Sequence, residues 1–253
     1  MRIGIAGIAG RMGRLLVEET RQAGHFIAGG LVRPGGQPAP PDIEAFTDLR
    51  DLAGICDVVI DFTAASTAST HAATLAQAGT AWVVGASGLS ADDEAAVARA
   101  AGAIPVIYSA NFSPGINLLL ALAERMAAAL PAESYDAEIV DMHHRQKVDS
   151  PSGTAVALGR AVAAGRGVDL AAVMDSGRDG HHGARKPGAI GFAALRGGQV
   201  VGEHTLLFAG ATEHVGLTHR AFDRRVFATG AVRAAAWAVG RAPGLYTMRD
   251  VMA

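Results

Sequence analysis

The sequence is poor in cysteine, aromatic residues and lysine. Cys56 is the only cysteine of the 253 residues, which excludes an internal disulfide framework and is typical of a reducing compartment. Aromatic residues make up 5% of the chain, so alanine, valine, leucine and isoleucine must build its core. Lys147 and Lys186 are the only lysines, although lysine and arginine together number 22. The positions of these two lysines are therefore a first clue to function.

The sequence also lacks a strong net charge and a long apolar run. Its formal net charge is −2, which argues against a surface for nucleic acid or for a membrane. No apolar run reaches the roughly 18 residues that a membrane-spanning helix needs, and the glycine-broken opening MRIGIAGIAG does not resemble a signal peptide. We therefore expect a soluble cytoplasmic protein with no nucleic-acid or membrane partner.

The first half of the chain alternates apolar strands with helices. Strands are expected at 2–7, 25–32, 57–62, 81–88 and 104–111, and helices at 11–24, 66–79 and 90–102. Ser90 is a suitable N-cap for the last of these helices, with Asp93 near its third position. This alternation is typical of a parallel sheet with right-handed crossovers.

The second half begins with a long apolar helix at 114–130 and then becomes rich in strands. An alternating strand is expected at 135–144, a helix opens in SPSGTAVALG, and three consecutive strand candidates lie between 189 and 222, which indicates an antiparallel or mixed sheet. The last helix, 229–240, is expected to pack back on the first domain. We predict an α/β protein with a Rossmann-like parallel-sheet domain (1–113 and 223–253) and a second α+β domain with a mixed or antiparallel sheet (114–222).

The motif GIAGRMG places glycines at 7, 10 and 13, between the first strand and the first helix. Glycine lets the backbone approach a pyrophosphate, whose charge the amides of a helix N-terminus can bind. The first interval is one residue longer than in the usual G-x-G, so a plain tight turn remains the alternative. The turns at 85–88 and 109–113 follow later strands, where a nicotinamide is expected, although each is by itself an ordinary turn.

The kind of dinucleotide depends on the end of the second strand. No Asp or Glu occurs between Glu19 and Asp42, so the acidic residue that binds the adenosine ribose of NAD is missing from its usual distance. Arg33 can instead pair with the 2′-phosphate of NADP, and a solvated arginine is the alternative. We expect NADPH to be favoured, with NADH not excluded.

The stretch HHRQKVDSPSGTA (143–155) uses Lys147 in a chain that otherwise uses arginine. Arginine keeps its proton near neutral pH, whereas lysine can donate one when its surroundings lower its pKa. Lys147 is therefore a candidate proton donor. Chance is the alternative, because Lys186 shows that a lysine also occurs in an apparently exposed loop.

His143 and His144 end the strand before this lysine, and successive strand residues point to opposite faces. One histidine can then meet a hydride path while the other faces a second ligand group. A metal site with Glu138 and Asp141 is a rival interpretation, but the spacing matches no standard zinc pattern. A pair of buried structural histidines is the other alternative.

The residues after the lysine suit an anionic ligand. Ser150 or Ser152 can cap a helix whose first turn holds Gly153 and Thr154, and such a terminus binds a carboxylate. A second histidine pair, at 181–182, lies in a glycine-rich loop. We expect that pair to be solvated or part of a mobile lid.

Taken in order, these motifs resemble the dihydrodipicolinate reductase family. The match runs nearly end to end through GIAGRMG, VVIDFT, GASG, NFSPGIN, EIVDMHHRQKVDSPSGTA, GAIGFAALRGGQVVGEHTLLF and FATGAVRAA. The stretch at 143–155 is the most specific of them. The resemblance implies an enzyme of diaminopimelate and lysine biosynthesis that reduces 4-hydroxy-tetrahydrodipicolinate, through dihydrodipicolinate, to tetrahydrodipicolinate with NADPH or NADH.

The resemblance also implies roles for single residues. It makes His143 the proton donor and acceptor and Lys147 a proton donor, and it implies a homotetramer formed through the second domain and no metal. The substrate is a small dicarboxylate held by His144, Gly153 and Thr154. The implied cofactor residues are Gly7, Ile8, Ala9, Gly10, Arg11, Met12, Arg33, Gly85, Ala86, Ser87, Ala110, Asn111, Phe112 and Ser113.

Three residues depart from the family pattern. Val32 stands where members often carry an acidic residue before Arg33, which weakens the case for NADH. Ala86 lacks a hydroxyl that the usual Gly-Thr-Thr-Gly places near the cofactor, and Pro114 fits the first turn of a helix. A related NAD(P)-dependent dehydrogenase of another amino acid or imine, and an inactive nucleotide-sensing homologue, remain the alternative functions.

Overall fold

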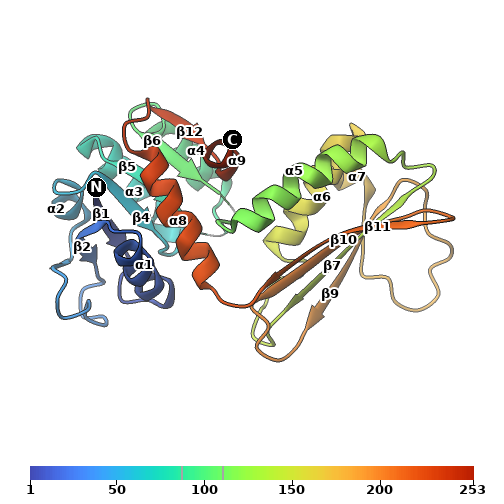
Figure 1. The fold of residues 1–253 in the computed structure, drawn as a ribbon, viewed down its shortest axis with the longest axis horizontal. Helices are drawn as coiled ribbons and strands as arrows, with labels where there is room; N and C mark the ends of the chain where they lie inside the picture. Colours follow the sequence, from blue (N-terminus) through green and yellow to red (C-terminus); the bar gives the residue numbers. More distant parts are fainter. Residues whose placement is uncertain (87, 110) are drawn as a thin grey trace. The chain divides into compact units, whose positions relative to one another are not determined.

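The computed structural model describes residues 1–86, 88–109 and 111–253. The chain forms two compact units: unit 1 comprises Met1–Pro114 and Arg224–Ala253, and unit 2 comprises Gly115–Asp223 (Figure 1). Each boundary lies one residue after the boundary expected from the sequence. Unit 1 is thus discontinuous in sequence, because the end of the chain returns to it.

Unit 1 is built on a parallel sheet. Within the described residues this sheet has seven strands in the order β12-β6-β5-β4-β1-β2-β3, and every pairing is parallel. The strands are β1 (Arg2–Ala6), β2 (Phe26–Leu31), β3 (Ala45–Phe46), β4 (Val58–Asp61), β5 (Ala81–Val84), β6 (Pro105–Tyr108) and β12 (Gly244–Tyr246). The strand order reverses beside β1, between β2 and β4, and ligands bind at such a switch point in open α/β sheets.

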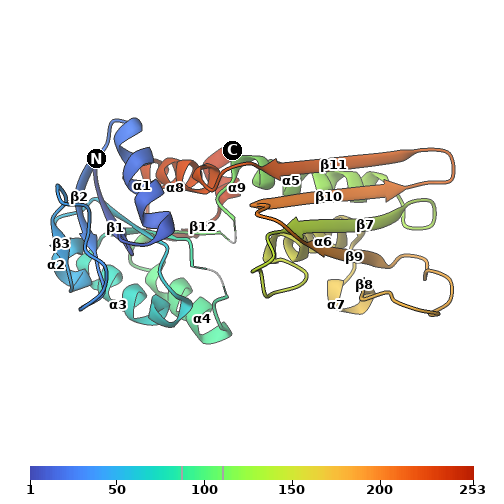
Figure 2. The ribbon, with the colours of Figure 1, turned by 90° about the horizontal axis from the view of Figure 1, so that it is seen from below.

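Helices cover both faces of this sheet (Figure 2). One core lies between the sheet and α1 (Arg11–Gln22), α8 (Arg225–Ala238) and α9 (Met248–Met252), and the other lies against α2 (Leu49–Ala53), α3 (Ala68–Ala78) and α4 (Ala91–Ala100). Side chains alternate along a strand, so Val83 joins the first core and Trp82 the second. A short 3-10 helix, η1 (Ala65–Thr67), precedes α3. The Rossmann-like parallel-sheet domain predicted from the alternation of strands and helices is confirmed.

Two predicted helix features are also confirmed. Ser90 and Asp93 form a reciprocal capping box at the start of α4. The last long helix, α8, packs against α1 and strands β4, β5 and β6 of unit 1, although it begins four residues earlier than expected.

Unit 2 is built on a mixed sheet with helices on one face (Figures 1 and 2). Among the described residues its five strands have the order β11-β10-β7-β9-β8, with antiparallel β10–β11 and β10–β7 pairs and parallel β7–β9 and β8–β9 pairs. The strands are β7 (Asp136–His143), β8 (Met174–Ser176), β9 (Ile190–Arg196), β10 (Gly202–Ala209) and β11 (His214–Ala221). This confirms the predicted second sheet.

The helices of unit 2 are α5 (Pro114–Ala129, which begins at the unit boundary), α6 (Gly153–Arg166) and α7 (Leu170–Val173). Ala123 and Ala127 of α5 and Leu158 of α6 bury against the inner face of the sheet, where β7 and β10 contribute Ile139 and Phe208. None of the helices in the described part of the chain has both the length and the apolarity needed to cross a membrane.

Candidate active site

The glycine turn joins β1 to α1 in a tightly packed form. Gly7 has φ = 77°, a left-handed conformation that favours glycine, and its carbonyl accepts a 2.9 Å hydrogen bond from the Gly10 amide. A Cβ on Gly13 would lie 2.3 Å from the Gly7 oxygen, so only glycine lets the helix approach the turn this closely. Gly10 caps α1 without a side-chain hydrogen bond. The first amides of the helix are therefore uncapped by a side chain and suit a pyrophosphate.

A pocket of about 460 Å³ opens at this turn, at the carboxyl ends of β1, β2 and β4. It is lined by Gly7, Ala9, Gly10, Leu31, Val32, Arg33, Gly36, Gln37, Phe62, Thr63 and Ala64. Four residues that the sequence assigned to the cofactor thus meet here, among them the exposed Arg33. Glycine backbone beside a cationic side chain fits the phosphates of a dinucleotide.

The pocket also holds residues that the sequence did not single out as cofactor residues. Thr63 follows β4, and its amide and hydroxyl donate to Oδ1 of Asp61 at 2.9 and 2.6 Å. Oδ2 of Asp61 lies 2.7 Å from Nδ1 of His71 and 3.3 Å from the indole nitrogen of Trp82. Burial would raise the pKa of Asp61, but the hydrogen bond and charge of His71 and the bonds from Thr63 hold it below its usual range. Asp61 thereby holds the turn at Thr63, which lines the pocket. The signal for this contact in the sequence is an aspartate at the end of a buried apolar strand, followed two residues later by a threonine.

Several other predicted cofactor residues are buried. Ile8 and Ser113 are fully buried, and Phe112 and Ala86 are 2% and 5% exposed. The Phe112 ring packs 5.6 Å from that of Phe62. For these residues the backbone, rather than the side chain, is the candidate contact.

The remaining predicted cofactor residues lie in the first turn of α1 and after β5 and β6. Arg11 is exposed, and Met12 packs partly against the core. Gly85 lies so close to Phe62 that an added Cβ would be 2.4 Å from its ring. Asn111 accepts a 2.8 Å hydrogen bond from the Ser113 amide. Ser87 and Ala110 lie outside the described residues.

In unit 2, His143 is the last residue of β7 and His144 follows it, so the strand ends one residue earlier than expected. His143 is buried (8% exposed) on the face covered by α6, and its Nδ1 lies 3.0 Å from Oδ2 of Asp141. The His144 amide donates to the carbonyl of Val200 at 2.8 Å. The Gly197 amide donates to the His143 carbonyl at 2.9 Å, so the segment between β9 and β10 holds the backbone of both histidines.

Lys147 lies in the turn that follows β7. Its amide donates to the His144 carbonyl at 3.1 Å, and its Nζ lies 2.7 and 2.9 Å from the two carboxylate oxygens of Asp149. Burial would raise the pKa of Asp149, but the hydrogen bond from Lys147 lowers it below its usual range. Asp149 is thus a partner of the candidate proton donor that sequence reasoning had not singled out.

Ser152, rather than Ser150, caps α6. Its Oγ accepts from the Ala155 amide at 3.1 Å, and Gly153 and Thr154 form the first turn. A Cβ on Gly153 would meet no heavy atom within 4 Å, so a ligand can approach the backbone there. His143, Lys147 and the start of α6 all belong to unit 2.

Asp141, His143 and His204 have ligand-type atoms within 4.8 Å of one another, an arrangement that could hold a metal ion. However, Nη1 of Arg196 lies 3.2 Å from Oδ2 of Asp141 and already balances that carboxylate. A divalent cation beside the guanidinium would be repelled. Glu138, the other carboxylate considered, pairs with Arg178 and Arg185 instead.

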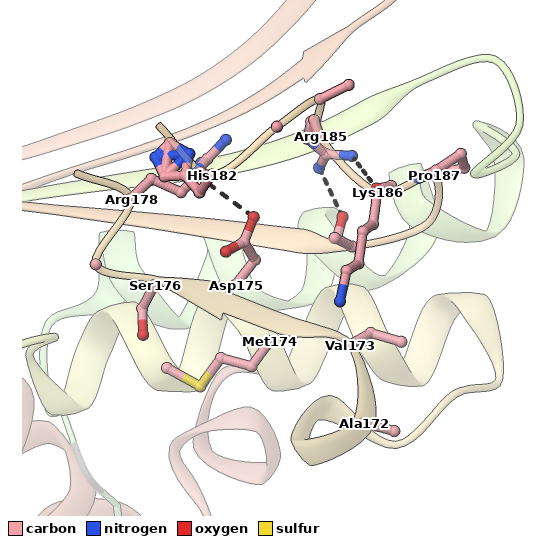
Figure 3. Close-up of a pocket in the computed structure, with 14 residues that line it drawn as sticks. Ala172, Val173, Met174, Asp175, Ser176, Arg178, His182, Arg185, Lys186 and Pro187 are labelled. Atoms are coloured by element: carbon pink, nitrogen blue, oxygen red, sulfur yellow. Dashed lines mark hydrogen bonds and ion pairs between the residues drawn. The ribbon is translucent and has the colours of Figure 1, made fainter. Parts of the chain in front are cut away.

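A larger pocket in unit 2, of about 580 Å³, lies between α7, β8 and the loop before β9 (Figure 3). His182 lines it, together with Arg178 and Arg185. Both arginines are paired with carboxylates: Arg178 with Glu138 and Asp175, and Arg185 with Asp136 and Glu138. The pocket lies at the start of β9. Arg196, which pairs with Asp141 beside His143, lies at the opposite end of that strand. Because carboxylates balance both arginines, the pocket is not our candidate site, although Lys186 also lines it.

Comparison with known proteins agrees with these features. The dihydrodipicolinate reductase N-terminus model matches residues 1–112, and the C-terminus model matches residues 115–252. A 4-hydroxy-tetrahydrodipicolinate reductase of Granulibacter bethesdensis is 66% identical over 100% of this chain and 97% of its own, and one of Gluconacetobacter diazotrophicus is 60% identical over the same shares. A solved structure, dipicolinate-bound dihydrodipicolinate reductase from Paenisporosarcina sp. TG-14, has the same fold, with a TM-score of 0.78 and 23% identity over 98% of this chain and 97% of that one. The chain belongs to the dihydrodipicolinate reductase family.

Proposed function

We propose that the chain is an NAD(P)H-dependent 4-hydroxy-tetrahydrodipicolinate reductase, the activity for which its close relatives are named. The observation that carries the proposal is the grouping in unit 2 of His143, Lys147 and the open first turn of α6. The uncapped glycine turn and its pocket in unit 1 support the cofactor. The product of the reaction is tetrahydrodipicolinate, an intermediate of diaminopimelate and lysine synthesis.

The residues divide the chemistry between binding and proton transfer. When bound, the nicotinamide would supply a hydride to ring carbon C4, from which the hydroxyl leaves as water, and the ring C=N bond is kept in the product. The amides and hydroxyl at the start of α6, with His144, bind the substrate carboxylates. Lys147 has an ammonium that can donate the proton that completes the reduction, and His143 has an imidazole that can release or accept a proton. Arginine in place of Lys147 would bind the same anion but would not release a proton.

We further propose that NADPH is preferred. Arg33 lines the pocket at the end of β2 beside Val32, a position with no carboxylate for the ribose hydroxyls of NADH. A guanidinium there matches a 2′-phosphate.

The proposed assembly is a homotetramer formed through the sheet of unit 2, and the proposed location is the cytoplasm. Figure 1 shows helices on one face of that sheet only. On the other face Val140 and Leu195 are 36% and 52% exposed. Exposed apolar side chains on a sheet face are typical of a subunit interface.

The lysines offer a matched test of the proposed reaction. We expect Lys147→Ala to lower kcat by roughly 10²-fold or more, the usual contribution of general acid catalysis, while NADPH affinity is kept. Lys186→Ala removes the other lysine and is expected to keep wild-type turnover. The assay follows NADPH oxidation with the condensation product of aspartate semialdehyde and pyruvate. Equal rates in both variants would contradict the role of Lys147.

A related dehydrogenase of another amino acid or imine is the second candidate. The Arg33 pocket and glycine turn would serve it equally well, but the carboxylate-binding start of α6 favours a dicarboxylate. A substrate panel of mono- and dicarboxylic imines separates the two, because only the first function requires both carboxylates.

A further inference from the structure

Asp141 is a buried carboxylate to which the proposed reaction gives no role so far. It lies two residues before His143 on β7, so both side chains point to the same face of the sheet. Its side chain is 1% exposed. Its Oδ2 lies 3.0 Å from Nδ1 of His143, an ion-pair contact without hydrogen-bond alignment, and 3.2 Å from Nη1 of Arg196. Among the described residues, this carboxylate is the acidic group paired with His143.

Arg196 connects Asp141 to the turn that carries Lys147. It ends β9 and stands opposite His143 in the sheet register. Its Nη2 donates to the main-chain oxygen of Asp149 at 2.7 Å, and the side chain of Asp149 holds the amine of Lys147. The arginine thus balances Asp141 and fixes the backbone beside the candidate proton donor.

The start of α6 approaches the same carboxylate. Burial would raise the pKa of Asp141, but the contact with His143, the charge of Arg196 and the nearby hydroxyl of Ser152 hold it below its usual range. Ser152 caps α6, and its Oγ lies 3.3 Å from Nε2 of His204 on β10. Burial and the nearby charge of His143 lower the pKa of His204 to about 4, so this second imidazole stays neutral. Asp141 therefore remains an anion near the imidazoles of His143 and His204.

An anion on Nδ1 decides where the proton of a neutral imidazole lies. One ring nitrogen of neutral histidine carries a proton and the other a lone pair, and a carboxylate at Nδ1 selects the Nδ1–H tautomer. Nε2 of His143 is then the atom that can accept or release a proton. A Cβ on Gly202, the first residue of β10, would lie 3.1 Å from this Nε2, so glycine limits crowding there.

We propose that Asp141 is a positioning residue: it fixes the ring and the tautomer of His143 and stabilises its protonated form, with Arg196 and Ser152 holding the carboxylate in place. This inference rests on the proton-transfer role of His143 in the proposed function. The charged and titratable groups around the ring are Asp141 on its own strand, Arg196 on β9, His204 on β10 and Lys147 in the next turn.

The first test is Asp141→Asn in the full chain. We expect kcat to fall by roughly 10²-fold or more, with the KM for NADPH unchanged. The pH limb set by His143 should move to lower pH, because an amide stabilises the imidazolium less than a carboxylate does. Asp136→Asn is the matched control, since Asp136 begins the same strand and pairs with Arg185 rather than with a histidine. A wild-type kcat and pH profile in folded Asp141→Asn would overturn the proposal.

The second test does not depend on activity. Nitrogen-15 NMR of the wild-type protein reports the tautomer of each neutral histidine, and the His143 signal is identified by its loss in His143→Gln. We expect Nδ1–H for His143 and a mixed or Nε2–H form in Asp141→Asn. An Nε2–H tautomer in the wild type would overturn the proposal. Absence of reductase activity in the wild type would instead refute the proposed function, and the NMR result would still decide whether Asp141 sets the tautomer.

Discussion

At the scale of single residues, Arg33 is the side chain on which the proposed preference for NADPH depends. It is exposed at the end of β2 and lines the pocket beside the glycine turn. If it binds the 2′-phosphate, Arg33→Ala should raise the KM for NADPH by roughly tenfold to a hundredfold, because hydrogen bonds between charged groups contribute about 1.5–3 kcal/mol. The KM for NADH should change little.

Steady-state kinetics with both cofactors check this expectation. Arg50→Ala serves as the control, because Arg50 is an exposed arginine of α2 in the same unit and lies outside the pocket lining. An equal loss of affinity for NADPH and NADH in Arg33→Ala would argue against a 2′-phosphate contact.

The role of a residue could be predicted where its type was unusual in the sequence. Its hydrogen-bond and ion-pair partners could not be predicted. Lys147 stood out because the chain has only two lysines among 22 basic residues, and the structure places it in the turn directly after the histidine pair. Its partner Asp149 gave no such signal, since it is one of 24 acidic residues. The contact of Asp141 with Arg196 joins residues 55 apart in sequence. Only the register of β7 with β9 creates that contact, and a single sequence does not reveal register.

At the scale of elements, the close packing of α1 on the glycine turn makes a sharper prediction than the motif itself. Gly13→Ala would place a Cβ 2.3 Å from the Gly7 oxygen and 2.5 Å from the Ile8 oxygen. Both are backbone atoms that cannot rotate away, so α1 must shift. We expect a loss of about 1–3 kcal/mol in unfolding free energy and weaker NADPH binding.

Thermal unfolding and cofactor titration of Gly13→Ala measure both effects. Gly54→Ala is the matched control, because Gly54 follows α2 with φ = −63° and an added Cβ would lie an ordinary 3.6 Å from the Arg50 oxygen. That variant should be neutral or slightly stabilised. Wild-type stability in Gly13→Ala would show that the turn is looser than the structure indicates.

Long, patterned elements followed from the sequence, and short ones did not. The strands of 57–62 and 81–88 and the helix at 114–130 were recognisable from apolar runs and correspond to β4, β5 and α5. The two-residue β3, the four-residue α7 and the three-residue β12 are too short for periodicity to indicate. Tertiary neighbours decide these pieces: β12 exists because it pairs with β6.

At the scale of the whole molecule, the change from alternating helices and strands to consecutive strands was enough to predict two units. It could not predict the strand order of unit 2, in which β7 lies between β10 and β9. That order matters for the site, because it brings His204 of β10 and Arg196 of β9 to either side of the β7 residues. The chemistry of unit 2 therefore depends on its topology as well as on its motif.

The same topology leaves one face of the sheet of unit 2 without helices. The proposed tetramer would use this face, which can be tested by mutation. Val140 and Met142 of β7 pair in register with Ala193 and Leu195 of β9, so these side chains share the face away from the core. Leu195→Glu would put a charge into a tetramer interface there, and a buried unpaired charge is strongly destabilising. Light scattering should then give a mass below the roughly four times 25.8 kDa that the proposed tetramer predicts for the wild type.

Leu245→Glu provides the comparison, because Leu245 is exposed to nearly the same extent, 50% against 52%, but lies on β12 of unit 1. It should leave the mass unchanged. If Leu195→Glu kept the wild-type mass, the interface would lie elsewhere, and if both variants dissociated, the effect would reflect added charge rather than the sheet face. A fall in mass confined to Leu195→Glu is the outcome that the exposed sheet face predicts.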